Sequence, residues 1–198
     1  MTAVLVRPFA AIFVLVSALV LSGCGINTIP TYEEQAKAAW SEVLNQYQRR
    51  ADLIPNLVET VKGYAAQEKD VLTSVVEARA KATQMTIPKD ILTDPAAFKK
   101  WQDAQGELGA ALGRLIAITE NYPDLKSNQN FLALQSQLEG TENRIAVARR
   151  DYIEAVRVYN TEVRTFPGIF GAWIYGAKPM ETFSISEDKT KTPEVKFN

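Results

Sequence analysis

Residues 128–165 read NQNFLALQSQLEGTENRIAVARRDYIEAVRVYNTEVRT, and this stretch decides the fold class. From here to the following Pro167, inward-type residues recur in alternating steps of three and four, at Phe131, Leu134, Leu138, Thr141, Ile145, Ala148, Tyr152, Val156, Tyr159, Val163 and Phe166. Such spacing is typical of one face of an α-helix. Ser127 or Asn128 can serve as the N-cap of this helix. From Asn128 to Thr165 it would be roughly 57 Å long at 1.5 Å per residue. A stripe that persists over this length favours near-parallel packing against other helices.

Two earlier segments show the same periodicity. The first begins near Thr31, which has Glu34 three residues later as in a capping box. Its stripe comprises Trp40, Val43, Tyr47, Ala51, Ile54, Val58, Val61, Ala65, Leu72 and Val75. The second begins at Asp94 and Pro95, an N-cap followed by a first-turn proline, and continues to Tyr122. Residues 86–93 between the two segments contain Pro88 and read as a connection.

Pro55 lies in the middle of the first segment. Proline lacks the N–H group and clashes with the carbonyl four residues earlier, so a straight helix is not expected at this point. One possibility is a single long kinked helix, which the near-continuous phase of the stripe favours. The other is two helices, the second capped by Asp52 with Pro55 in its first turn.

These segments predict an all-α fold, an up-and-down antiparallel bundle of three to four long helices. We expect a signal peptide over residues 1–23, a tether over residues 24–30 and the helical bundle over residues 31–166. Residues 167–198 would form an apolar segment and a mobile C-terminal tail. Residues 169–175 carry Phe, Trp and Tyr, so this segment either packs on the bundle or docks on a membrane or partner.

The N-terminus predicts export and lipid attachment. Arg7 precedes an apolar stretch over residues 8–21, which is shorter than the roughly 20 residues a membrane-spanning helix needs. Leu21, Ser22, Gly23 and Cys24 follow, and they resemble the lipobox of bacterial lipoproteins. That resemblance implies cleavage between Gly23 and Cys24 and lipidation of the Cys24 thiol. The alternative is an uncleaved helix over residues 4–23 that spans the membrane.

Either anchor places the bundle outside the cytoplasm, in the bacterial cell envelope. The membrane is then the first expected partner, bound through the N-terminal lipid anchor. Gly25 follows the predicted anchor. By resemblance to lipoproteins of Gram-negative bacteria, glycine at this position permits sorting to the outer membrane.

The composition excludes several kinds of chemistry. The chain has 198 residues, with 22 Lys and Arg, 23 Asp and Glu, one Cys and no His. Without His it cannot build a Ser-His-Asp or Cys-His catalytic unit or a His-liganded zinc site. Its formal net charge of −1 gives no long-range attraction to a nucleic acid. We therefore expect no catalytic, cofactor or metal site and no nucleic-acid partner.

Two blocks of sequence resemble the signature of the LemA family. They are QRRADLIPNLVETVKGY at residues 48–64 and EGTENRIAVARRDY at residues 139–152, supported by YPDL at 122–125 and FPG at 166–168. The resemblance covers roughly residues 40–183. It implies an envelope protein with an N-terminal membrane anchor and an antiparallel helical bundle, without established catalytic activity or cofactor. Many family members keep a transmembrane helix, whereas this N-terminus ends in a lipobox.

Four arginines form a possible interaction patch: Arg49, Arg50, Arg149 and Arg150. Arginine presents a rigid fork that binds carboxylates in a bidentate manner. One interpretation is an ion-pair network between helices near Pro55. The other is a recognition patch for an acidic segment of a partner or for a phosphate-bearing lipid or glycan.

Two functions fit these features. The first is a non-enzymatic, lipid-anchored envelope protein that acts as a scaffold or adaptor for other membrane or envelope proteins. The second is a bundle that binds a lipid or a cell-wall fragment through the arginines or the apolar C-terminal segment.

Overall fold

The computed structural model describes residues 27–183. The predicted signal peptide, the cleavage site between Gly23 and Cys24, the lipid on Cys24 and the polar tail beyond Ser186 lie outside the described residues. The elements follow in the order α2 (Thr28–Lys62), α3 (Lys69–Gln84), the 3₁₀ turn η1 (Ile91–Thr93), α4 (Pro95–Thr119), α5 (Pro123–Lys126), α6 (Gln129–Arg164) and α7 (Gly168–Tyr175).

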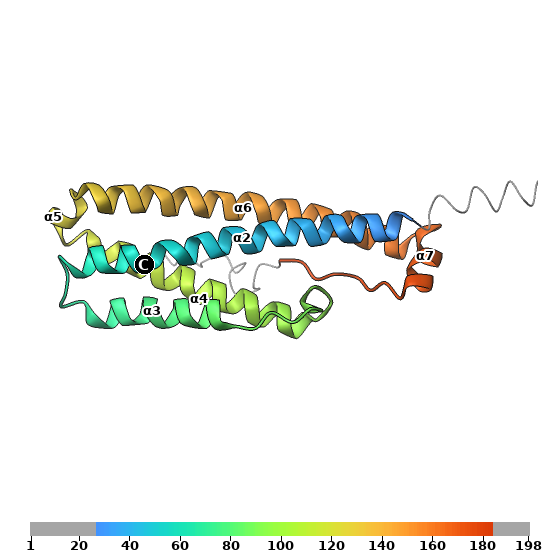
Figure 1. Cartoon of the computed structure of the whole chain (residues 1–198), viewed down its shortest axis with the longest axis horizontal. Helices are drawn as coiled ribbons and strands as arrows, with labels where there is room; N and C mark the ends of the chain where they lie inside the picture. Colours follow the sequence, from blue (N-terminus) through green and yellow to red (C-terminus); the bar gives the residue numbers. More distant parts are fainter. Residues whose placement is uncertain (1–26, 184–198) are drawn as a thin grey trace, which may run out of the picture.

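Helices α2, α3, α4 and α6 run alternately in opposite directions along the molecule (Figure 1). α2 lies against α6, and α3 lies against both α2 and α4. α5 and α7 lie at opposite ends of the bundle (Figure 1). The predicted all-α, up-and-down antiparallel bundle is therefore confirmed, and residues 27–183 contain no strand. Over the same range, none of the helices combines the length and the hydropathy of a membrane span.

α2 continues through Pro55 as one helix, so the alternative with a second helix capped by Asp52 is wrong. The single long helix is also wrong over its full length, because the chain turns over residues 63–68 and α3 begins at Lys69. Proline has no N–H to give to the carbonyl of Ala51 four residues earlier. A side chain of the neighbouring helix replaces that donor, because Nε of Arg79 on α3 donates to the Ala51 oxygen at 2.8 Å. Ala51 is buried, and a buried carbonyl without a donor would cost free energy. Arg79 thus allows a proline inside a helix of 35 residues.

Replacement of Pro55 by alanine is expected to raise the free energy of unfolding by about 1–3 kcal/mol, since proline is the least favourable residue in a helix interior. Arg79→Ala in the natural sequence should lower it by about 1–2 kcal/mol, because the Ala51 carbonyl loses its donor. The same change should cost less in the Pro55→Ala background, where the new N–H at position 55 reaches Ala51. Urea unfolding of the four proteins measures this coupling.

The exposed Arg114 on α4 provides a matched control, and Arg114→Ala should change stability by less than about 0.5 kcal/mol. Equal costs of Arg79→Ala in both backgrounds would show that Arg79 does not compensate for Pro55.

Two predicted helix starts are confirmed. Asp94 caps α4, and its carboxylate accepts from the N–H groups of Ala96 at 2.9 Å and Ala97 at 3.1 Å. Asn128 caps α6, and its side chain accepts from the N–H of Phe131 at 3.0 Å. Both caps satisfy backbone donors that the first turn of a helix leaves free.

The predicted start of the first helix is wrong by three residues. α2 begins at Thr28, so the predicted tether over residues 24–30 ends earlier than expected. Thr31 does not act as a cap, because its hydroxyl donates to the carbonyl of Asn27 at 2.9 Å. The physical reason is tertiary. Ile29 is fully buried in the core, and its burial extends the helix toward the N-terminus.

The core divides into two parts along the bundle. The part nearer α5 is mainly aliphatic and includes Ile54, Leu57, Leu108 and Leu115. The part nearer α7 is aromatic and brings together Trp40, Phe98, Trp101, Tyr152 and Phe183. Ring centroids of Trp40 and Trp101 are 4.8 Å apart in an edge-to-face arrangement, which aromatic pairs favour.

The bundle extends beyond the predicted boundary at residue 166. After α7 the chain turns back along the bundle (Figure 1), and Met180 is only 6% exposed. Backbone groups of this segment are held by α6. Asn160 both donates to and accepts from the backbone of Met180 at 2.8 Å, and the Tyr152 hydroxyl donates to the Glu181 carbonyl at 2.7 Å. Residues 177–183, here called the C-terminal strap, therefore belong to the folded core.

Candidate functional site

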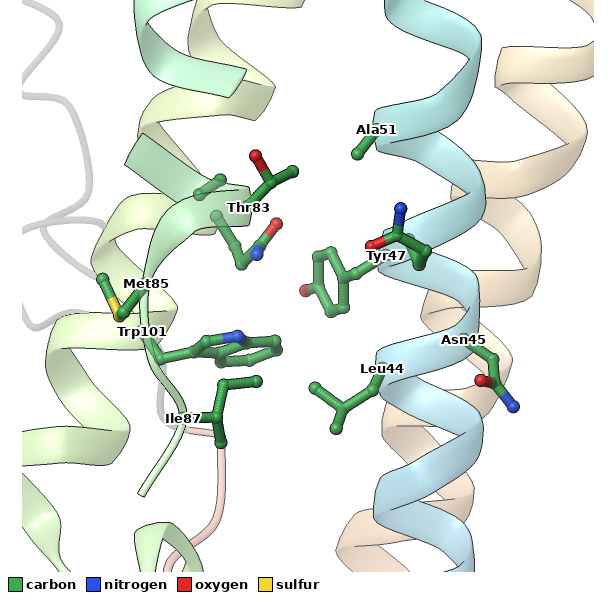
Figure 2. Close-up of a pocket in the computed structure, with 11 residues that line it drawn as sticks. Leu44, Asn45, Tyr47, Ala51, Thr83, Met85, Ile87 and Trp101 are labelled. Atoms are coloured by element: carbon green, nitrogen blue, oxygen red, sulfur yellow. The ribbon is translucent and has the colours of Figure 1, made fainter. Parts of the chain in front are cut away.

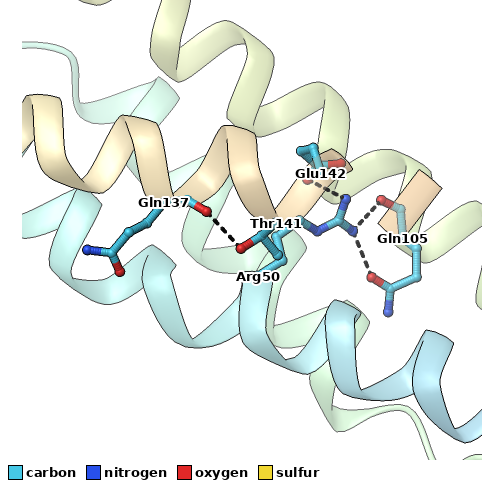
Figure 3. Close-up of polar contacts among 5 residues, drawn as sticks. All are labelled: Arg50, Gln105, Gln137, Thr141 and Glu142. Atoms are coloured by element: carbon cyan, nitrogen blue, oxygen red, sulfur yellow. Dashed lines mark hydrogen bonds and ion pairs between the residues drawn. The ribbon is translucent and has the colours of Figure 1, made fainter. Parts of the chain in front are cut away.

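Arg50 is the centre of a polar cluster that joins three helices. Its side chain is 4% exposed and points from α2 toward α4 and α6 (Figure 3). Nη2 donates to the backbone carbonyl of Gln105 at 3.1 Å and to its side-chain oxygen at 2.8 Å. Nη1 donates to a carboxylate oxygen of Glu142 at 3.2 Å. The guanidinium also lies 4.8 Å from the centroid of the Tyr47 ring, within the range of a cation–π contact.

The prediction of an exposed arginine patch is wrong for Arg50. Arg50 does not reach the surface, so it cannot belong to an exposed recognition patch. The interpretation as an ion pair between helices applies to it, because Glu142 lies on α6. Its Nε atom is buried without a hydrogen-bond partner, although both terminal nitrogens are bonded. The side chain is therefore held by its planar fork, a geometry that a lysine does not reproduce.

The other three arginines differ in their surroundings. The guanidinium of Arg149 lies 4.3 Å from the centroid of the Phe183 ring, so Arg149 covers the C-terminal strap. Arg49 and Arg150 are exposed, and Arg150 lies 3.7 Å from a carboxylate oxygen of Asp151. Of these three arginines, Arg149 thus contacts a ring of the aromatic core, and Arg49 and Arg150 remain at the surface.

Tyr47 links the arginine cluster to a pocket. Burial raises the pKa of its hydroxyl, and the positive charges of Arg149 and Arg50 oppose that shift. The net direction is upward, so the hydroxyl stays protonated at neutral pH. Tyr47 is therefore a neutral hydrogen-bonding group here and does not serve as a base.

The pocket lies beside Tyr47, between α2 on one side and the end of α3 and the start of α4 on the other (Figure 2). Its volume is about 200 Å³. The lining is Leu44, Asn45, Tyr47, Gln48, Ala51, Ala82, Thr83, Met85, Ile87, Trp101 and Gln105. Amides and two hydroxyls accompany the apolar groups, but no carboxylate or amine lines the pocket. Ligand sites for drug-sized molecules usually measure about 300–1,000 Å³, so this space suits a small fragment or a few waters.

Gln105 contributes to both the arginine cluster and the pocket, and sequence reasoning did not assign it a role. Its signal was present, because a polar residue occupies a position in the apolar stripe of α4. Such a residue is buried by the geometry of the helix and needs a partner. The identity of that partner, Arg50, became visible only from the packing of α2 against α4 and α6.

Within residues 27–183 no group of three or more Asp, Glu, His or Cys is placed to hold a metal ion. The predicted lipidation residue Cys24 and cleavage residue Gly23 lie outside this range.

Comparisons with known proteins place this chain in a family. The sequence matches the model of the LemA family over residues 39–197. The chain belongs to the LemA family. That match includes the aromatic half of the core and the C-terminal strap. It therefore covers Trp40, Arg50 and Phe183, the residues that hold the bundle together.

Three individual relatives are between 22% and 32% identical to this chain. The chain is 32% identical over 174 residues to "Magnetosome protein MamQ 2" of Paramagnetospirillum magneticum, an alignment that covers 79% of this chain and 64% of the relative. It is 30% identical over 174 residues to "Magnetosome protein MamQ" of Magnetospirillum gryphiswaldense, with the same shares covered. "Protein LemA" of Metamycoplasma hominis is 22% identical over 140 residues, which cover 71% of this chain and 60% of that protein. The chain thus spans less than two thirds of these relatives.

Proposed function

We propose that this protein is a non-enzymatic, lipid-anchored component of the bacterial cell envelope. Its bundle stands outside the cytoplasm and acts as a scaffold or adaptor for other membrane or envelope proteins. The observation that carries the proposal is the position of Asn27, three residues after Cys24, at one end of a long four-helix bundle (Figure 1). α2 has 35 residues. It therefore extends about 52 Å from that end at 1.5 Å per residue.

The pocket beside Tyr47 supports an adaptor more than an enzyme or a lipid carrier. The pocket beside Tyr47 has a volume of about 200 Å³, too small for an acyl chain with its headgroup. Its lining offers no general base at neutral pH, since Tyr47 keeps its proton. The hypothesis that four arginines bind a phosphate-bearing lipid or a cell-wall fragment also loses support. Arg50 lies in the core, and Arg149 covers Phe183.

The lipid anchor is tested by metabolic labelling with palmitate in a bacterial host. We expect label on the natural protein and complete loss of label in Cys24→Ala, because only a thiol at that position accepts the diacylglyceryl group. Ser22→Ala is the matched control, since alanine keeps a small residue before the cleavage site and should keep the label. Label that persists in Cys24→Ala would contradict the anchor.

The adaptor role is tested by photo-crosslinking in living cells, with the reactive residue placed at Val147. This residue is 46% exposed on α6, in a shallow groove between α2 and α6 that Glu42, Arg144 and Asp151 also line. We expect crosslinks to a small set of envelope proteins, identified by mass spectrometry. The same probe at the exposed Thr73 on α3 serves as the control position. Absence of any protein crosslink from both positions would argue against an adaptor.

A further inference from the structure

α7 has an unusual distribution of side chains. Its small residues Gly168, Gly171 and Ala172 are buried against the bundle. Its large apolar residues and the preceding Phe166 point to solvent: Phe166 is 81% exposed, Ile169 48%, Phe170 60%, Trp173 84% and Ile174 58%. The four positions within α7 follow steps of one, three and one, so they form one stripe on the helix. The Phe166 ring precedes the helix and lies 6.1 Å from the Phe170 ring, measured between centroids. We call the stripe together with Phe166 the α7 face.

The α7 face is held in place on both sides. Gly168 allows α7 to approach α6 closely, because a Cβ there would overlap the backbone carbonyl of Glu162. At the other end Gly176 adopts φ +63°, a left-handed conformation that glycine accepts without strain. The next N–H, of Ala177, then donates to the Ala172 carbonyl at 2.8 Å and closes the helix. The exposed rings therefore belong to a capped helix seated on the bundle.

The chemistry of the α7 face matches the boundary between lipid headgroups and acyl chains. Residues 166–177 carry no charged side chain, while the exposed Arg164 and Lys178 flank them on either side. Aromatic residues with basic neighbours are typical of segments that lie at a membrane interface. Each basic residue near an anionic bilayer adds about 1 kcal/mol of attraction.

The α7 face also lies at the end of the bundle where α2 begins. The hydroxyl of Thr28, the first residue of α2, donates to the carboxylate of Glu162 at 2.7 Å, close to the start of α7. Figure 1 shows α7 at this same end. Cys24 precedes Asn27 by three residues, a span of at most about 11 Å when fully extended. A lipid on Cys24 would therefore hold α7 within this short reach of the bilayer surface.

We propose that the α7 face docks on the lipid bilayer in which Cys24 is anchored and gives the protein a second attachment to that membrane. This inference rests on the proposed lipid anchor. The occupant is a lipid surface, because the anchor limits how far this end can move from the bilayer. Two attachments at one end would fix the direction in which the bundle projects, whereas a lipid at a single point would leave it free to tilt.

The test uses full-length protein purified from membranes and reconstituted into vesicles of phosphatidylethanolamine and phosphatidylglycerol, with or without bromine on the acyl chains. Among the three tryptophans of the chain, Trp40 and Trp101 are buried at 6% and 2% exposure, whereas Trp173 is 84% exposed. We expect brominated lipid to quench part of the tryptophan emission. Trp173→Phe should abolish the difference between the two vesicles, and its melting temperature should stay unchanged because the ring is exposed.

Equal emission of the natural protein in both vesicles would overturn the docking proposal. The mass of the N-terminal peptide from the same sample separates the two hypotheses. A lipidated peptide without quenching would support the lipid anchor and contradict the docking of α7. Quenching without lipid on Cys24 would support contact of Trp173 with the bilayer and contradict the lipid anchor. In cells, a photoreactive residue at Phe170 should crosslink to lipid. Crosslinks to a second copy or to another protein would instead assign the α7 face to a protein interface.

Discussion

Replacement of Phe183, a partly buried ring packed against the aromatic core, by alanine is expected to lower the free energy of unfolding by about 2 kcal/mol. The Phe183 ring lies 5.3 Å from the ring of Phe98 and 5.7 Å from that of Tyr152, measured between centroids, and the Arg149 guanidinium lies 4.3 Å from its centroid. Truncation would leave a cavity between α4 and α6 and would release the C-terminal strap. Urea unfolding followed by far-UV circular dichroism measures the change.

Phe170→Ala is the matched control, because it removes the same ring from a site that is 60% exposed. We expect a change below about 0.5 kcal/mol for this variant in the absence of membrane. Equal effects of the two substitutions would show that the C-terminal strap does not contribute to the core.

Arg50→Ala is the second change with a large expected effect, a loss of about 2–4 kcal/mol. It removes the donor from the buried side-chain oxygen of Gln105 and leaves Glu142 without its ion pair. Most of the loss should come from Gln105, because it is buried, whereas the Glu142 side chain is 46% exposed and water can solvate it. Arg50→Lys should recover only part of the loss, since one ammonium group cannot reproduce the planar fork.

Its neighbour Arg49 gives the control, because Arg49→Ala alters an exposed side chain and should change stability by less than about 0.5 kcal/mol. A double-mutant cycle between Arg50 and Glu142 should yield a small coupling, as expected for a pair that is exposed on one side. If Arg50→Ala were as stable as the natural protein, Arg50 would have no structural role and a ligand-binding role for it would regain support.

Local sequence signals predicted the buried faces of the long helices, for a physical reason, but they missed the turn over residues 63–68 that separates α2 from α3. A stripe of apolar residues in steps of three and four can be buried only on one face of a helix, whatever its neighbours are. Caps are equally local, since Asp94 and Asn128 bond to N–H groups two or three residues away. Thr31 shows the limit of this reasoning. Thr31 and Glu34 have the spacing of a capping box, but burial of Ile29 extends α2 to Thr28, N-terminal to Thr31.

Contacts across the bundle account for what sequence reasoning could not locate. The donor that Ala51 needs comes from Arg79, and residue types along α2 alone do not identify that partner. Phe183 lies in a mainly polar stretch without periodicity, so only its position among Trp40, Phe98 and Tyr152 reveals a core residue. The α7 face has a visible apolar composition, but which side of that helix is buried depends on the close approach of Gly168 to Glu162.

The sequence by itself determined an all-α bundle, the N-terminal caps of α4 and α6, and the expectation of a lipid anchor at Cys24. Each of these depends on residues within a few positions of one another. The tertiary structure decided that Arg50 is a buried link between three helices, that the C-terminal strap completes the aromatic core, and that α7 presents its large apolar side chains to solvent. These features depend on distances between segments far apart in the chain, which are set only when the helices pack.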